Sequence, residues 1–221
     1  MQTVSQPWVV EGGNPALAVC QGETRVSALK LGCVRPIVPG DVMLAEGQTA
    51  GVAILPLSGA LQMGKTTSRG RRQIICTVGA GSCDGVCLLN LGDAALTDIR
   101  GLQGGEALFL DRETFLSLTH SDAGLASAAW LSAQRCMAHL SGIVEQLSFH
   151  KVGERVAAAL VDGTEEDGDQ VRLTQADLAA AVGTTREVVA RSLASLQADG
   201  LLRLGRGRII VLDRVELARR C

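Results

Sequence analysis

The stretch TQADLAAAVGTTREVVARSLASLQADGLLRL, residues 174–204, has the pattern of two short helices joined by a tight turn and followed by a strand. Thr174, with Asp177 three residues later, predicts a capping box, in which side-chain oxygens accept the free N–H groups at a helix start. Gly183 supplies the left-handed residue that a sharp helix exit requires. The stretch therefore predicts a helix-turn-helix rather than one continuous helix.

The second helix of this stretch has one apolar and one charged side. Thr184 or Thr185 is expected to cap it. The residues expected to face the core are Val188, Val189, Leu193 and Leu196. Arg186 and Glu187 fall in the first turn, which is the part of a recognition helix that meets base edges in the major groove. Arg191 lies four residues after Glu187, so these two side chains are predicted to pair along the helix.

The run Val182-Gly183-x-x-Arg186-Glu187-x-x-x-Arg191 resembles the helix-turn-helix of the CRP/FNR superfamily of bacterial transcription regulators. Its Arg-Glu-x-x-x-Arg pattern is similar to the catabolite-activator branch rather than to the fumarate-nitrate branch. Residues 193–202 resemble the closing helix of the family, and residues 205–211 resemble its winged hairpin. A helical hairpin inside a core is the alternative, but the basic, glycine-containing wing favours DNA binding.

The resemblance implies a homodimer that binds double-stranded DNA at a palindrome of TGTGA-like half-sites one DNA turn apart, with RNA polymerase as a further partner. Arg186 is expected to read a guanine and Glu187 a cytosine N4, while Arg191 contacts a guanine or a phosphate. The residues expected to hold phosphates, which position the domain without reading sequence, are Thr174, Thr185, Arg206 and Arg208.

Composition limits the class of protein. The chain has 221 residues, 47% of them hydrophobic, so it can bury one large core or two small ones. The net charge is only −2, so DNA affinity must come from local clustering of arginines in the last third of the chain. No apolar run approaches the ~20 residues that span a bilayer, and no secretion signal is evident. We therefore expect a soluble, cytoplasmic protein with no membrane partner.

Residues 25–118 show short apolar runs separated by glycine turns, a pattern typical of an antiparallel barrel or sandwich. The runs are 42–44, 52–55, 60–63, 73–78 and 106–110. By resemblance this region is the double-stranded β-roll of a cyclic-nucleotide-binding-like sensor domain. The expected fold class is α+β: an irregular lead-in over 1–24 with a short helix near 14–19, the β-roll over 25–118, a dimerisation helix over 122–148, and a winged helix-turn-helix over 149–221.

The sequence argues against cyclic AMP as the effector. In nucleotide-binding members of the family, a Gly-Glu pair holds the ribose and an Arg-Ser or Arg-Thr pair holds the phosphate. Here Val86 occupies the glutamate position and Leu96 the arginine position, although Thr97 matches the Ser/Thr. A buried phosphate without a bidentate cation is poorly compensated.

Cysteines offer a different sensor chemistry. Cys76, Cys83 and Cys87 lie in or next to residues 79–87, the loop in which this sequence differs from the nucleotide-binding members. Thiolates bind zinc, copper(I) or iron–sulfur clusters, or switch by forming a disulfide. The alternative is that they are small buried hydrophobes. The chain has seven cysteines, an odd number without zinc-ribbon spacing, so a disulfide framework is not expected. The cofactor therefore stays open between a metal, an iron–sulfur cluster and thiol redox.

A long apolar stripe follows the predicted roll and is predicted to form the dimer interface. Its heptad a and d positions are Ala126, Ala129, Ala133, Cys136, Leu140, Ile143 and Leu147. The alternative is a monomeric helix that packs on its own roll. Asp111 is predicted to cap a short helix before it, and Asp122 to begin the long one.

Two other functions are alternatives to an effector-controlled regulator. An effector-independent DNA-binding dimer would use the roll only for dimerisation. A metal- or cofactor-binding β-barrel enzyme would need a nucleophile–base constellation. The three histidines (His120, His139 and His150) all fall in the helical middle, and no strand pair carries matched carboxylates. The sequence therefore predicts a regulator, not an enzyme.

Overall fold

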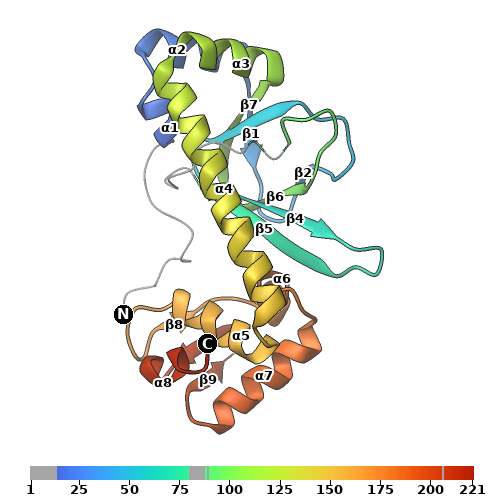
Figure 1. The fold of residues 1–221 in the computed structure, drawn as a ribbon, viewed down its shortest axis with the longest axis vertical. Helices are drawn as coiled ribbons and strands as arrows, with labels where there is room; N and C mark the ends of the chain where they lie inside the picture. The colour runs from blue at the N-terminus through green and yellow to red at the C-terminus, as the bar shows by residue number, and fades with distance from the viewer. Residues whose placement is uncertain (1–13, 80–87, 89, 206) are drawn as a thin grey trace. The chain divides into compact units, whose positions relative to one another are not determined.

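The computed structural model describes residues 14–79, 88, 90–205 and 207–221. Its described residues divide into two compact units. One holds residues 14–65 together with the described part of Ile75–Leu140, and the other holds Thr66–Ile74 together with the described part of Ser141–Cys221. The first unit is built mainly on β-strands, and the second is mainly helical (Figure 1).

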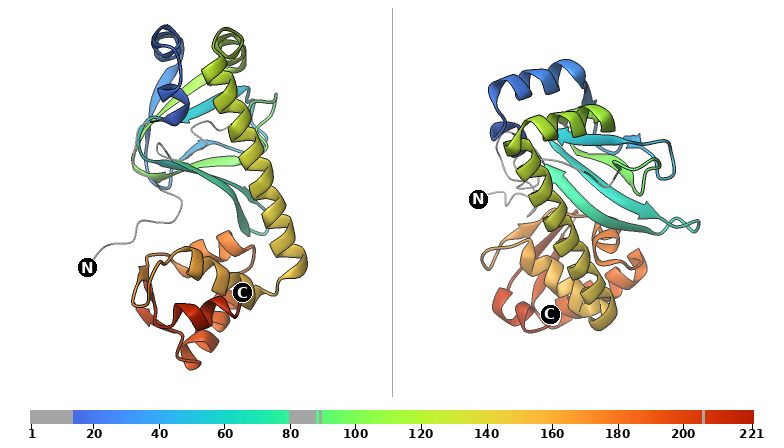
Figure 2. Two further views of the ribbon diagram at one scale, coloured as in Figure 1. Left: turned by 60° about the vertical axis from the view of Figure 1, so that its left-hand side comes forward. Right: turned by 45° about the horizontal axis from the view of Figure 1, so that its top comes forward.

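Two antiparallel sheets form the β-roll (Figure 2). The first has the strand order β1-β7-β3, and the second has the order β2-β6-β4-β5. The strands are β1 (Cys33–Ile37), β2 (Val42–Leu44), β3 (Val52–Pro56), β4 (Ala60–Thr66), β5 (Arg72–Gly79), β6 (Asp98–Gln103) and β7 (Gly105–Asp111). Apolar side chains such as Ile54, Met63 and Ile99 are fully buried in this region. This burial supplies the hydrophobic free energy that holds the roll together.

The five apolar runs in the sequence correspond to β2, β3, β4, β5 and β7, so those strand predictions are confirmed. Strands β1 and β6 were not predicted, because Pro36 and charged residues interrupt their apolar pattern. Gly40, Gly47 and Gly59 have positive φ angles at the expected turns, a conformation that glycine adopts without steric cost.

The start of the chain differs from the expectation that the β-pattern begins at residue 25. Residues Gly22–Leu31 form helix α2, preceded by the short helix α1 (Pro15–Ala18) near its predicted place. Alternation with period two is absent from GETRVSALKL, and its Ala, Leu and Lys favour a helix. Helix α2 contacts β1, β7 and helix α3 (Arg112–Ser121), with Ala28 fully buried.

Helix α3 begins after Asp111, whose carboxylate accepts the Thr114 N–H at 2.9 Å, as the cap prediction required. Helix α4 (Ala123–Phe149) then runs without a break (Figure 1). Asp122 is 1% exposed, and its carboxylate oxygens accept the N–H groups of Gly124 at 2.8 Å, Leu125 at 3.1 Å and Gln21 at 2.8 Å. Asp122 therefore caps α4 and also ties the segment before α2 to it.

Replacing Asp122 with alanine is expected to lower the thermal unfolding midpoint at neutral pH. Hydrogen bonds from the Gln21 backbone, the Thr24 side chain and the Leu125 backbone hold the pKa of Asp122 below its usual value. A depressed pKa contributes stability above the unfolded value of about 3.9, which is lost as pH falls through the folded pKa. The difference in unfolding midpoint between wild type and Asp122→Ala, measured by calorimetry, should therefore be largest at pH 6 and should shrink below pH 4. A gap that stays constant down to pH 2 would contradict this role.

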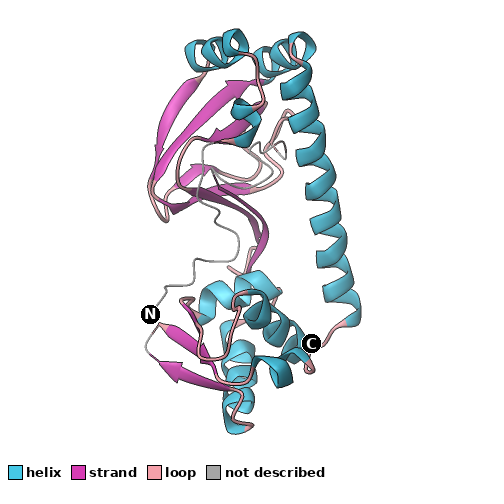
Figure 3. Cartoon of the chain, turned by 90° about the vertical axis from the view of Figure 1, so that its left-hand side faces the viewer, coloured by secondary structure: helices cyan, strands magenta, loops and turns pink. Residues whose placement is uncertain are grey.

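The C-terminal unit combines helices with a three-stranded sheet of order β8-β10-β9, drawn in magenta beside cyan helices in Figure 3. Its elements after α4 are α5 (Val152–Asp162), β8 (Gln170–Val171), α6 (Gln175–Val182), α7 (Arg186–Ala198), β9 (Leu202–Gly205), β10 (Arg208–Val211) and α8 (Arg214–Ala218). Val156, Leu160, Leu178, Val189 and Leu193 are fully buried in a common core. This arrangement is the predicted winged helix-turn-helix.

Within the described residues, no helix is both long and apolar enough to cross a bilayer.

Candidate DNA-binding surface and sensor region

Helix α7 presents a charged first turn above a buried side. Arg186, Glu187 and Arg191 are exposed, whereas Val189 and Leu193 are fully buried. Thr185 is the N-cap residue, but its side chain makes no capping hydrogen bond. The helix continues to Ala198, so the separate closing helix expected over 193–202 is wrong. Leu193 and Leu196 continue the buried stripe that starts at Val189, so the helix has no reason to end between them.

Glu187 is held by its own turn rather than by Arg191. A hydrogen bond from its own backbone N–H, then one from the Thr185 hydroxyl, lowers the pKa of Glu187, with smaller contributions from the charges of Arg186 and Arg191. No ion pair joins Glu187 to Arg191 among the described contacts, so the predicted i,i+4 pair is not formed. The carboxylate is therefore ionised at neutral pH and oriented at the start of the helix, while Arg191 remains exposed.

Thr174 forms the predicted capping box at the start of α6. Its Oγ1 accepts the Asp177 N–H at 3.1 Å and donates to Asp177 Oδ2 at 2.6 Å, while Oδ2 accepts the Thr174 N–H at 3.2 Å. The hydroxyl proton of Thr174 is thus already used within the protein. Gly183 ends α6 with φ +69°, the predicted left-handed exit. A phosphate contact through the Thr174 hydroxyl would compete with its bond to Asp177.

A groove of about 510 Å³ lies between the starts of α6 and α7 and the β9–β10 hairpin. Thr174, Arg186 and Arg208 line it, so the structure brings together three of the predicted DNA-contacting residues. Gly207 turns the hairpin with φ +67° and Arg208 is exposed after it. Arg206, another predicted phosphate contact, lies outside the described residues. Arginines on one concave face, with no carboxylate lining it, form an anion-attracting surface.

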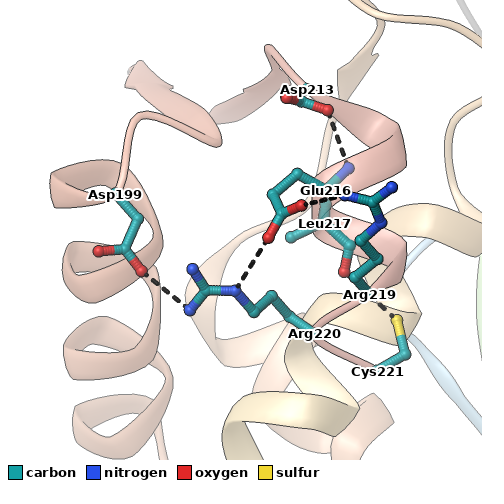
Figure 4. Close-up of polar contacts among 7 residues, drawn as sticks. All are labelled: Asp199, Asp213, Glu216, Leu217, Arg219, Arg220 and Cys221. Atoms are coloured by element: carbon teal, nitrogen blue, oxygen red, sulfur yellow. Dashed lines mark hydrogen bonds and ion pairs between the residues drawn. The ribbon is translucent and has the colours of Figure 1, made fainter.

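The three arginines near the C-terminus do not add to this surface, contrary to the clustering expected from the sequence. Arg220 Nη1 lies 3.2 Å from Asp199 Oδ2, and Arg219 Nη1 lies 3.0 Å from Glu216 Oε2 (Figure 4). Arg214 donates through Nε to the Thr164 carbonyl at 2.9 Å. Arg214 and Arg220 thus connect the α8 region to the end of α5 and to the end of α7, whereas the pair of Arg219 lies within α8 itself. The positive charge proposed for phosphates therefore lies on α7 and the wing.

Lys151 stands at the N-cap of α5 and makes no side-chain capping bond. A lysine has no acceptor for helix N–H groups. Glu154 supplies half of a box instead, because its Oε2 accepts the Lys151 N–H at 2.9 Å. The start of α5 is therefore capped by Glu154, a residue of the helix itself.

The residues at the expected phosphate position serve the fold of their own loop. Thr97 is 3% exposed, and its hydroxyl lies 3.4 Å from the amide nitrogen of the fully buried Asn90. Asn90 Oδ1 accepts the N–H groups of Leu96 at 2.8 Å and Thr97 at 3.3 Å. The Leu96 side chain is 58% exposed and carries no charge. This pair therefore offers no cation, and its one hydroxyl is buried and accepts a hydrogen bond from Asn90.

Of the three cysteines predicted to act as a sensor, the structure describes only Cys76. Cys83 and Cys87 lie outside the described residues. Cys76, on β5, is half-buried and packs against the roll core beside Met43 and Val52. In the described part of the chain, no three histidines, cysteines or acids gather as a metal site. The packing of Cys76 is what the buried-hydrophobe interpretation predicts for that residue.

Helix α4 has a more exposed apolar face than the one predicted for the dimer. Trp130, Met137 and Val144 are spaced by seven residues and are 75%, 72% and 63% exposed. The predicted a and d positions are half-buried in the single chain, except Leu147 at 45% exposure, and Ala129 packs against the roll core. The sequence also contains this seven-residue repeat from Trp130, but each of its residues follows a residue of the predicted dimer stripe by one position.

Known proteins resemble both parts of the chain. Residues 34–122 match the family described as a cyclic nucleotide-binding domain, and residues 154–220 match the Crp-like helix-turn-helix domain. The cyclic AMP receptor protein of Thermus thermophilus is 30% identical over 178 residues, covering 79% of this chain and 81% of that protein. The chain belongs to the CRP/FNR family of transcription regulators. A second relative, the HTH-type transcriptional regulator Cmr of Mycobacterium tuberculosis, is 29% identical over 189 residues, with 85% and 75% covered.

Solved structures agree on the fold of this CRP/FNR-family regulator. The c-di-GMP responsive global regulator CLP of Xanthomonas campestris superposes with a TM-score of 0.77 at 21% identity, covering 87% of this chain and 99% of that one. A CooA mutant from Carboxydothermus hydrogenoformans gives 0.76 at 16% identity, with 97% and 98% covered. The matching families and curated relatives are transcription regulators, not enzymes, and the protein is a DNA-binding regulator of that type.

Proposed function

We propose that this CRP/FNR-family regulator binds, as a homodimer, a palindromic DNA site with TGTGA-like half-sites. The observation that carries the proposal is the first turn of α7, where Arg186 and Glu187 are exposed at the edge of an arginine-lined groove. A guanidinium reads guanine O6 and N7 in the major groove, and a carboxylate accepts from cytosine N4. The lowered pKa of Glu187 keeps that carboxylate in the accepting form.

Phosphate contacts would come from the rim of the same groove. Arg208 on the wing is exposed and lines it, and Arg206 precedes it in the sequence. Thr185 is exposed at the N-cap of α7, and the free N–H groups of that helix end also favour anions. Thr174 would contribute chiefly by setting the start of α6. These contacts position the domain, whereas Arg186, Glu187 and Arg191 carry the sequence preference.

Dimerisation would use the exposed apolar face of α4. A helix that leaves Trp130, Met137 and Val144 in water at heptad spacing gains free energy when a second copy covers them. The half-buried stripe that includes Ala133, Cys136 and Leu140 would border that contact. Two-fold symmetry of the pair then matches a palindromic operator.

The effector of this regulator would not be cyclic AMP. The name of the Thermus relative makes that nucleotide the first ligand to consider, but here Leu96 offers no charge and Thr97 is bonded to Asn90. A metal, redox or other signal sensed at Cys76, Cys83 and Cys87 stays a prediction. An effector-independent dimer is the second candidate function, and the uncharged Leu96 at the expected arginine position favours it over a nucleotide switch.

Fluorescence anisotropy with a labelled TGTGA palindrome and a shuffled duplex, each with and without cyclic AMP, tests this function. We expect tighter binding to the palindrome by at least about 4 kcal/mol, the lower end for specific over non-specific sites. Cyclic AMP at 1 mM should change neither affinity, and isothermal titration calorimetry should detect no binding. Equal affinity for both duplexes would contradict the proposed site, and micromolar binding of cyclic AMP would contradict the effector argument.

A further inference from the structure

Arg155 is a buried cation that forms no ion pair with any residue in the described part of the chain. It lies in α5 next to the core residues Val156 and Ala157, and only 8% of its surface is exposed. Its Nε and Nη1 atoms are buried and have no hydrogen-bond partner in the described part of the chain. Burial lowers the pKa of its guanidinium, which nevertheless stays charged at neutral pH. A buried charge is normally paired, because taking an ion out of water without a partner is costly.

Arg155 lines a cavity of about 260 Å³. Its wall is formed by Gly142, Glu145 and Gln146 of α4, by His150, by Glu154, Arg155 and Ala158 of α5, and by Cys221. Because a water molecule occupies about 30 Å³ of liquid volume, the space suffices for an inorganic or small organic anion. The cavity joins the last turns of α4 to the first helix of the DNA-binding domain, all within the C-terminal unit.

The two acidic residues of the wall do not neutralise Arg155. Glu154 is engaged elsewhere, since its Oε2 accepts the Lys151 N–H at 2.9 Å and lies 3.7 Å from His150 Nδ1. Glu145 is exposed, and the described contacts include no ion pair from it to Arg155. The described part of the chain thus leaves Nε and Nη1 of Arg155 without partners, but neither atom has accessible surface, so an anion in the cavity would approach Arg155 through Nη2. His150 offers a further ring nitrogen.

We propose that this cavity binds a small oxyanion, a phosphate- or carboxylate-bearing ligand, through Arg155. A guanidinium donates charge-assisted hydrogen bonds to the oxygens of such a group, and these bonds are stronger than those between neutral groups. Binding would hold the end of α4 and the start of α5 in one arrangement. Control of DNA affinity by this route rests on the proposed function, whereas binding itself does not.

Gly142 provides a way to close the cavity without disturbing the fold. A Cβ at this position meets no atom within 4 Å, and replacing a helical glycine removes its entropic penalty. Gly142→Leu therefore fills the space and should fold at least as well as wild type. Gly153→Ala on α5, where an added Cβ also meets nothing within 4 Å, is the matched control away from the wall. Arg155→Met removes the charge while keeping an apolar side chain in its place.

The test measures thermal unfolding and calorimetric binding of the full chain, without DNA, in inorganic phosphate or succinate against sodium chloride of equal ionic strength. We expect at least one of the two anions to bind and to raise the thermal unfolding midpoint. A response to phosphate alone indicates a phosphate-bearing ligand, and a response to succinate alone indicates a carboxylate-bearing one. Gly142→Leu and Arg155→Met should weaken that binding at least tenfold, whereas Gly153→Ala and Arg186→Ala should retain it.

Several results would overturn the proposal. One is no response to either anion at 20 mM, and another is undiminished binding in Gly142→Leu. Loss of binding in Arg186→Ala would assign the anion to the DNA-facing groove instead. Glu145→Gln distinguishes an internal partner: it should strengthen anion binding by removing a negative charge. If it lowers the unfolding midpoint of the anion-free protein, Glu145 is the counter-ion of Arg155 and the cavity needs no ligand. Because no DNA is present, failure of the proposed operator would leave these outcomes unchanged.

Discussion

Replacement of Arg186 by alanine is expected to weaken binding to the TGTGA palindrome by about 1–3 kcal/mol per half-site. Affinity for shuffled DNA should change little. The side chain is exposed in the first turn of α7, so alanine removes its contacts to a base edge without opening the core. Anisotropy titrations on both duplexes at one fixed salt concentration measure the difference, because salt alone changes such affinities by orders of magnitude.

Arg219→Ala is the matched control for that loss of charge. Arg219 is also exposed, but it pairs with Glu216 at 3.0 Å in the C-terminal cluster (Figure 4). Its replacement should leave both duplexes nearly unaffected. Equal losses on the palindrome and on shuffled DNA after Arg186→Ala would mean that Arg186 only contacts phosphates. Arg186→Lys should recover the attraction to phosphates but not the planar guanidinium that reads guanine.

A glutamate in place of Met137 is expected to shift the dimer toward monomers by at least about 2 kcal/mol, roughly a thirtyfold increase in the dissociation constant. Met137 is 72% exposed in the single chain, at the centre of the stripe that begins at Trp130 and ends at Val144. In a symmetric dimer the substitution places two like charges in an apolar contact. Sedimentation equilibrium measures the constant, and operator affinity should fall with it.

His139→Glu is the control for the added charge on the same helix. His139 is exposed and lies off the Trp130–Met137–Val144 stripe, two residues from Met137 and so on another side of the helix. It should leave the dimer intact. A monomeric wild-type protein would contradict dimerisation through α4. A dimer that tolerates Met137→Glu but not a charge at Ala133 would show that the interface follows the stripe first predicted from the sequence.

The electrostatics of the C-terminal unit show where counting residues misleads. Arginines are frequent in the last third of the chain, yet Arg214, Arg219 and Arg220 bond to carbonyls or carboxylates of their own domain. Arg155 is withdrawn into the interior. The positive surface that remains is small and sits at the start of α7 and on the wing. A nearly neutral chain can therefore present a local anion-binding face.

The sequence by itself determined the local structure of this protein. Caps at Asp111, Asp122 and Thr174 and the left-handed Gly183 are decided by neighbours within a few residues, and the structure shows each of them. Alternating and 3.6-residue periods likewise predicted most strands and the long helix. Together with the Arg-Glu-x-x-x-Arg pattern, they were enough for the family, and the DNA-reading residues stay a prediction.

Only the tertiary structure decided which groups are available. Whether Trp130 or Ala129 faces water depends on how much of α4 the roll covers, and helical periodicity cannot report that. The same holds for Thr97, which is buried and accepts a hydrogen bond from Asn90, and for Arg155, which is buried beside a cavity. Their partners or neighbours come from other turns, loops and elements. Availability of a side chain is a property of packing between segments, whereas caps and periods are properties of one segment.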